Sequence, residues 1–103
     1  MTKNSEKYPV ELNDYECKLV LNNAMVFGQL KSTLIRMSKK EGIHAIQMSA
    51  YDINDIAGWM AAESNHAKSA IMSEELGNLC DHFENITYQI KRNALSTNMK
   101  IKS

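Results

Sequence analysis

Glycine and proline are scarce in this sequence of 103 residues, which holds four glycines and a single proline. This scarcity argues against a turn-rich β-sandwich or β-barrel and favours long helices. Long apolar runs are missing too, since none approaches the roughly 20 residues that a membrane-spanning helix needs. The first seven residues lack the apolar core of a secretory signal. We therefore expect one domain over residues 1–103, located in the cytoplasm and not in a membrane, with residues 1–9 and 95–103 flexible.

Net charge is absent as well, because twelve acidic residues balance twelve basic ones. The total gives no support to a protein that binds polyanions over its whole surface. The charges are nevertheless unevenly distributed. From Tyr51 to Ile90 seven acidic residues stand against a single lysine, whereas residues 91–103 hold four basic residues and no acid. Such asymmetry is typical of interaction surfaces, although solvated surface is the commoner explanation.

Cysteine is also rare, and the two present, Cys17 and Cys80, form no metal-binding or redox motif. Each lies on the apolar stripe of a predicted helix, so we expect two buried free thiols. The sequence further lacks a glycine-rich phosphate loop, a serine-centred nucleophile elbow and paired zinc-ligand knuckles. These absences argue against an enzyme and give no reason to expect a cofactor.

The first predicted helix begins after Asn13, which can accept a hydrogen bond from the first turn while Glu16 reaches back to the cap. Its apolar residues recur at three- and four-residue steps and therefore share one face. They are Cys17, Val20, Ala24 and Phe27. Gly28 interrupts this helix, because glycine costs about 1 kcal/mol relative to alanine in a helix interior. We expect either a kink or a break there, before the helical pattern resumes and ends near Gly42.

A short strand is predicted at residues 43–48, between a glycine and a helix-capping serine. One strand cannot satisfy its own backbone hydrogen-bonding groups. Its partner is either the segment 8–12, where Pro9 suits an edge strand, or a strand across a dimer. The sequence leaves both pairings open, and Ile46 and Met48 are therefore candidates for a subunit interface.

Two further helices are predicted between about Asp52 and Arg92, each with an apolar stripe. The first begins after Ser49 or Asp52, and the second after Ser69 or Ser73, because these side chains can cap a helix. The fold class that follows is mainly α: a three-helix domain with one short β segment.

Two acidic pairs, Asp52 with Asp55 and Glu74 with Glu75, are of the kind used in general acid–base catalysis. Catalytic carboxylates usually need burial to tune their pKa values. We place these four in the first turns of the two helices, where the helix dipole favours negative charge and solvent is close. Helix capping explains them better than catalysis does. Acids at the start of the last helix also argue against a helix-turn-helix, whose recognition helix has to approach phosphates.

The spacing Glu63-x-x-His66 is the sharpest candidate for a metal site. Residues at i and i+3 share a helix face, and carboxylate-bridged di-iron bundles use two such motifs with further carboxylates. This chain has one, so His82, Glu84 or a second subunit would have to complete the site. The simpler interpretation is a solvated glutamate and a histidine near a helix C-terminus.

Three functions follow from these features, in descending order of support. The first is a non-enzymatic interaction module that binds itself or another protein, since small helical domains often complete their cores by dimerising. Trp59, beside a buried stripe, is the first residue to test for such a contact. The second is a nucleic-acid-associated regulator that uses basic residues outside the acidic helices, namely Lys39, Lys40, Lys91 and Arg92. The third is a metal-dependent enzyme around Glu63 and His66.

Overall fold

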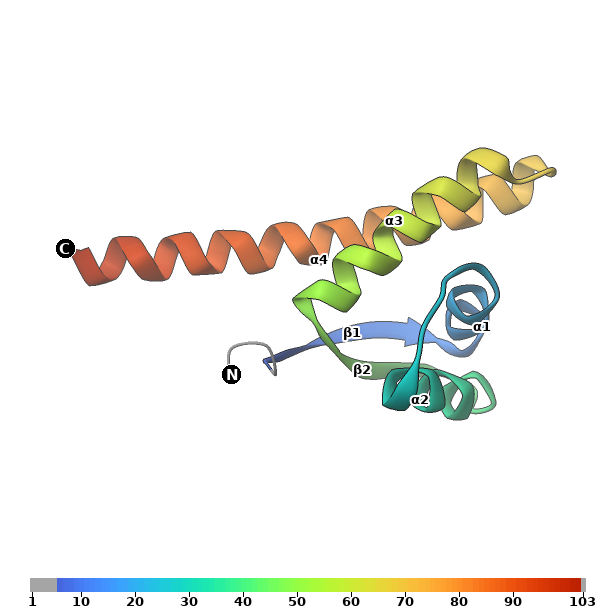
Figure 1. Cartoon of the computed structure of the whole chain (residues 1–103), viewed down its shortest axis with the longest axis horizontal. Helices are drawn as coiled ribbons and strands as arrows, with labels where there is room; N and C mark the ends of the chain where they lie inside the picture. The colour runs from blue at the N-terminus through green and yellow to red at the C-terminus, as the bar shows by residue number, and fades with distance from the viewer. Residues whose placement is uncertain (1–5, 103) are drawn as a thin grey trace.

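Four helices and a two-stranded sheet form the part of the chain that the computed structural model describes, residues 6–102, with side chains described to residue 93 (Figure 1). Their order is β1 (Lys7–Asn13), α1 (Asp14–Asn23), α2 (Gly28–Ser38), β2 (Ile43–Ser49), α3 (Ala50–His66) and α4 (Ala70–Lys102). The mainly α prediction with a short β segment is confirmed. The predicted first helix, however, is divided into α1 and α2.

Of the two outcomes expected at Gly28, a kink or a break, the break is the correct one, since α1 and α2 are separate helices. Asn13 and Glu16 form the predicted capping box, with the Glu16 amide 2.7 Å from Asn13 Oδ1 and the Asn13 amide 2.9 Å from Glu16 Oε1. α1 then ends at Asn23, and residues 24–27 connect it to α2. Gly28 has a φ of +63°, a conformation that side chains with a Cβ rarely adopt, and it starts the new helix.

β1 and β2 pair antiparallel with each other, so the pairing within the chain is the correct one of the two alternatives. Val10 lies opposite Ile46 in the register. Val10, Leu12, Ile46 and Met48 are buried on one face of the sheet, and the residues between them in each strand are exposed. The strand partner for β2 therefore comes from the same chain.

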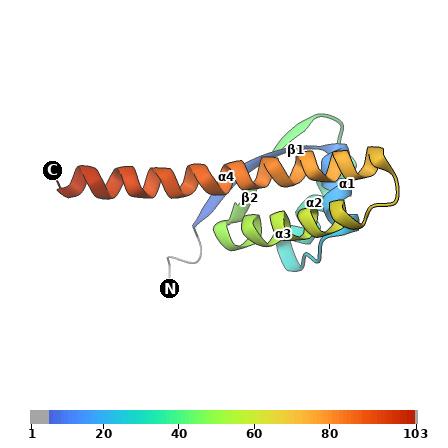
Figure 2. The ribbon, with the colours of Figure 1, turned by 90° about the horizontal axis from the view of Figure 1, so that it is seen from above.

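α3 and α4 lie side by side and antiparallel (Figures 1 and 2). Two serines close the connected end, because the Ser64 hydroxyl donates to the Ser73 carbonyl at 2.8 Å and the Ser73 hydroxyl donates to the Ser64 carbonyl at 2.9 Å. Each helix begins at the earlier of its two predicted caps. The hydroxyl oxygens of Ser49 and Ser69 accept hydrogen bonds from first-turn amides at 3.1 and 3.0 Å.

These early caps correct the placement of the acidic pairs. Only Asp52 lies in a first turn, where it completes a capping box. Asp55, Glu74 and Glu75 lie beyond the first turns, because the serine caps add a turn of helix ahead of them. Glu75 instead accepts a hydrogen bond of 2.6 Å from the Tyr15 hydroxyl, which joins α4 to α1. Helix capping therefore explains one of the four acids.

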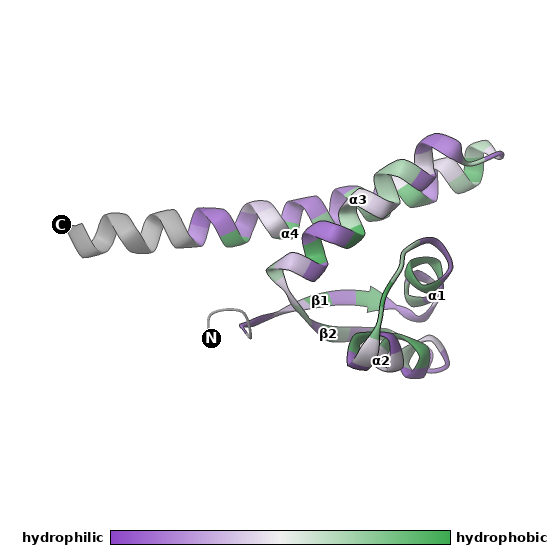
Figure 3. Cartoon of the chain, in the orientation of Figure 1, coloured by the Kyte–Doolittle hydropathy of each residue, from purple (hydrophilic) through white to green (hydrophobic). Residues whose placement is uncertain are grey.

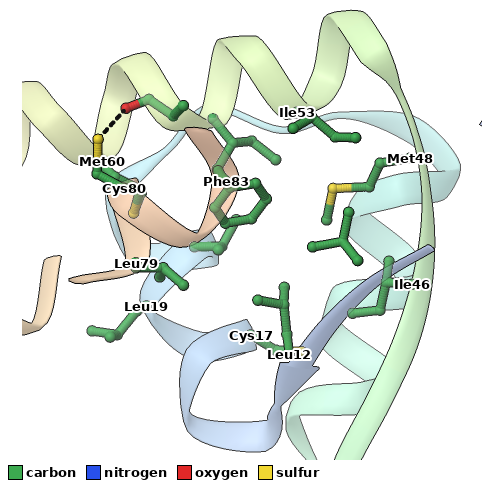
Figure 4. Packing of buried hydrophobic residues seen from close by; sticks show 14 of the residues in the cluster. Leu12, Cys17, Leu19, Ile46, Met48, Ile53, Met60, Leu79, Cys80 and Phe83 are labelled. Carbon is green, nitrogen blue, oxygen red and sulfur yellow. Dashed lines mark hydrogen bonds between the residues drawn. The ribbon is translucent and has the colours of Figure 1, made fainter. Parts of the chain in front are cut away.

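The hydrophobic core lies between the buried face of the sheet and the helices around it, and all six elements contribute to it. Phe83 of α4 is fully buried and points into the middle of this cluster, near Ile53 of α3 and Met48 of β2 (Figure 4). Cys17 and Cys80 belong to the same cluster as free thiols, as predicted. One core thus holds both the sheet and the helical pair.

α4 sets the long dimension of the molecule. Its 33 residues correspond to about 50 Å of helix at 1.5 Å per residue, and the molecule extends over 51 Å. The C-terminal half of α4 runs past the start of α3 and away from the other elements (Figures 1 and 2). Among the helices described over residues 6–102, none is both long enough and apolar enough to span a bilayer.

Candidate protein-interaction surface

A groove of about 180 Å³ opens where the connection between α1 and α2 meets the start of α3. Met25, Phe27 and Tyr51 line it and are 61%, 74% and 76% exposed. Asp52 and Asp55 line the same groove. We call this site, formed by these five residues with Val26, Leu30 and Ile56, the Phe27 groove. Exposed apolar side chains gathered in one place mark binding surfaces more often than scattered ones do.

Extended backbone between α1 and α2 produces the apolar wall of the Phe27 groove. Ala24 and Phe27 both have β-region dihedral angles, and side chains alternate between two faces along an extended chain. Ala24 and Val26 accordingly pack against the core, and Met25 and Phe27 point outward. Figure 3 shows this connection as a hydrophobic stretch. The prediction that Phe27 continues the buried stripe of the first helix is therefore wrong.

Two carboxylates give the Phe27 groove a negative charge. Asp52 also accepts from the Ser49 amide, at 3.4 Å, so its position is fixed by the capping box of α3. Asp55 follows one turn later on the same helix. Apolar walls beside two carboxylates are complementary to a ligand that carries an apolar side chain next to a cation.

The three residues predicted as partner contacts have different positions. Ile46 and Met48 are 1% and 0% exposed and belong to the chain's own core, so neither offers a surface to a partner. Trp59 is half-buried and packs against that core. The most exposed aromatic side chains, Phe27 and Tyr51, instead lie with Met25 at the Phe27 groove, and the sequence pattern predicted none of these three as a partner contact.

Glu63 and His66 lie in the last turns of α3, and His66 is the final residue of that helix. In the described part of the chain, no group of three or more His, Cys, Asp or Glu side chains is placed to hold a metal ion. His82, one of the ligands considered for completing the site, lies against β1, with its Nε2 atom 2.9 Å from the Glu11 carbonyl oxygen. The structure therefore does not bring a third described ligand to Glu63 and His66.

The four basic candidates for nucleic-acid contact do not converge. Lys39 caps the C-terminus of α2, with Lys40 next to it, whereas Lys91 and Arg92 are exposed on α4. Figure 1 shows α2 and the C-terminal half of α4 at opposite ends of the molecule. The Arg92 guanidinium carbon lies 5.9 Å from the centre of the Tyr88 ring. Arg92 thus belongs to a local pair of side chains on α4 and not to a basic patch shared with α2.

Their surroundings make the two thiols poor nucleophiles. Burial, with smaller contributions from Glu16 and Asp14, raises the pKa of Cys17 to about 11. Burial also raises the pKa of Cys80, whose thiol donates to the Ala57 carbonyl oxygen at 3.5 Å. A thiol must become a thiolate to act as a nucleophile. Neither cysteine therefore has the environment of a reactive residue.

We expect the Cys17 thiol to react slowly with a disulfide reagent. At pH 9 its thiolate fraction should be about 50-fold lower in the folded chain than in the unfolded one, given pKa values of about 11 and 9.0. The variant Cys80→Ser isolates this thiol, and the same variant in denaturant is the control. Because the folded-state pKa is raised, this thiol's contribution to stability is complete below pH 9 and is lost as the pH rises through 11. Equal rates in folded and unfolded protein would contradict the burial of Cys17.

A comparison of the chain with protein-family models, with curated proteins and with solved structures finds no match.

Proposed function

We propose that this chain is a non-enzymatic protein-interaction module that associates with a second copy through the Phe27 groove. The observation that carries the proposal is the exposure of Met25, Phe27 and Tyr51, at 61–76%, around one groove with acidic residues at its side. Large aromatic and apolar side chains of this kind dominate the energetics of protein interfaces.

The expected affinity is moderate. Burying a large apolar side chain completely contributes about 1.5–3 kcal/mol. Covering the exposed parts of Met25, Phe27 and Tyr51 would therefore contribute roughly 3–6 kcal/mol in total. Association itself costs about 4–15 kcal/mol in lost translational and rotational freedom. A lasting complex thus requires two such grooves or additional contacts, which a symmetric dimer provides.

The compartment proposed for this module is the cytoplasm. Cys17 and Cys80 are free thiols in the structure. Free thiols persist in compartments that glutathione and thioredoxin keep reduced, whereas secreted domains of this size commonly use disulfides. The thiols support a cytoplasmic setting on that ground.

Sedimentation velocity over about 1–200 μM tests the proposed self-association, since this range brackets micromolar dissociation constants. The wild-type chain should shift from monomer to dimer as its concentration rises. Phe27→Asp should raise the dissociation constant at least about tenfold, because it replaces an apolar ring that the partner would cover with a charge that would have to be desolvated. Ile71→Asp is the matched control, since Ile71 is 72% exposed at the start of α4 and lies outside the groove. A wild-type chain that stays monomeric throughout would refute self-association.

A further inference from the structure

The C-terminal half of α4 carries a second exposed aromatic site. This part of the helix projects beyond α3 (Figures 1 and 2). Tyr88 is 55% exposed there, and Arg92, one turn later, lies with its guanidinium carbon 5.9 Å from the centre of the Tyr88 ring. The two side chains thus present an aromatic anchor and a positive charge together on one side of the helix.

Charge distinguishes this part of α4 from the Phe27 groove. Glu84 is the last acidic residue of the chain, and residues 85–103 contain four basic residues. The groove combines apolar walls with the carboxylates of Asp52 and Asp55. An aromatic ring with an adjacent guanidinium matches both properties of the groove, because the ring can cover apolar surface while the cation approaches a carboxylate.

We infer that the Phe27 groove is occupied by the Tyr88–Arg92 pair of a second copy, an inference that rests on the self-association proposed above. Within one chain, Tyr88 and Tyr51 are both more than half exposed, so the pair does not fill its own groove. α4 is a continuous helix from Ala70 to Lys102, and turning its C-terminal half back onto the chain would break it. The contact is therefore made between chains.

Reciprocal exchange would make this contact symmetric. If each chain inserts its Tyr88–Arg92 pair into the groove of the other, both grooves are filled and the dimer closes. A one-way contact would leave one groove and one helix free at the ends of the complex and would lead to larger assemblies at high concentration. The sedimentation experiment separates these two forms of the contact, because a closed dimer stops at twice the monomer mass.

A charge exchange between Asp55 and Arg92 tests the inference directly. In sedimentation velocity, Asp55→Arg and Arg92→Glu should each raise the dissociation constant about five- to tenfold, because each places like charges face to face. The chain with both substitutions should recover affinity to within about threefold of wild type, since the opposite charges face each other again. Arg36→Glu makes the same charge change as Arg92→Glu on α2 and should have no effect.

Mixing the two single variants provides a second readout. Each variant alone forms a weak dimer. In a mixed dimer, however, one of the two reciprocal contacts has the exchanged charges and the other has the natural charges, so both contacts are attractive. A 1:1 mixture should therefore form more dimer than either variant by itself, which labelling one chain with a fluorophore makes visible. Circular dichroism spectra that match wild type show that both variants are folded.

The outcomes that overturn the inference differ from the one that overturns self-association. If the wild type dimerises and the single substitutions leave its affinity unchanged, the helix of the second copy is not the occupant, although self-association stands. If the singles weaken the dimer and neither the double variant nor the mixture recovers it, Asp55 and Arg92 do not face each other. If the wild type is monomeric at every concentration, both proposals fail and the groove is left to a different protein.

Discussion

Replacing Phe83 by alanine should lower the free energy of unfolding by about 3–5 kcal/mol, because the substitution removes a fully buried ring and leaves a cavity behind. A domain of this size has a total stability of about 5–15 kcal/mol. The variant would therefore lose a large share of its stability and could be partly unfolded at ambient temperature. Urea unfolding followed by circular dichroism measures the loss.

The position of Phe83 explains why the alanine variant should lose nearly as much stability as any single substitution can cause. Its ring lies where α4 meets α3 and the sheet, close to Ile53 and Met48 (Figure 4). Elements from distant parts of the chain surround the resulting cavity, so no single segment can move in to fill it. Phe83→Leu, which keeps most of the volume, should lose clearly less than the alanine variant.

A control on the same helix separates burial from helix propensity. Gln89 is exposed on α4, and Gln89→Ala should change the free energy of unfolding by no more than about 0.5 kcal/mol. A loss below about 1 kcal/mol for Phe83→Ala would contradict the packing of α4 against the core. It would also contradict the joining of the helical pair and the sheet in one core.

The buried stripe of α4 was predictable because one long helix carries it. Leu76, Leu79, Cys80 and Phe83 repeat at helical spacing, and all four are buried although Gly77 lies among them. Helical spacing gave the wrong prediction at Phe27. The spacing of Phe27 from Ala24 fits a helix face, but α1 ends at Asn23 and the next residues are extended backbone.

The Phe27 groove could not be predicted because its parts come from segments that are distant in the sequence. Phe27 follows α1, whereas Tyr51 and Asp55 lie in the first half of α3. Their proximity arises because α2 connects to β2 through residues 39–42 and packs back against it, so that the start of α2 lies near the end of β2, where α3 begins. The sequence left open whether the first helix kinks or breaks at Gly28, and so it could not place the start of α2 beside the start of α3.

The choice of strand pairing determines how a charge at Ile46 changes the stability of the fold. Ile46→Asp should lower the free energy of unfolding by at least about 4 kcal/mol, since it removes a buried apolar side chain and buries a carboxylate without a partner. Gln47→Asp introduces the same side chain at the neighbouring, exposed position of β2 and should cost about 1 kcal/mol or less. Urea unfolding of both variants gives the comparison.

Measuring stability at several protein concentrations distinguishes the loss of a contact within the core from the loss of a contact between subunits. Ile46 faces Val10 of the same chain, so its replacement should destabilise the monomer equally at low and high protein concentration. If β2 instead formed part of a dimer interface, Ile46→Asp would leave a folded monomer and abolish association, and the apparent stability of the wild type alone would rise with concentration. A folded, monomeric Ile46→Asp variant would therefore contradict the pairing of β1 with β2 and would favour a strand shared between two copies.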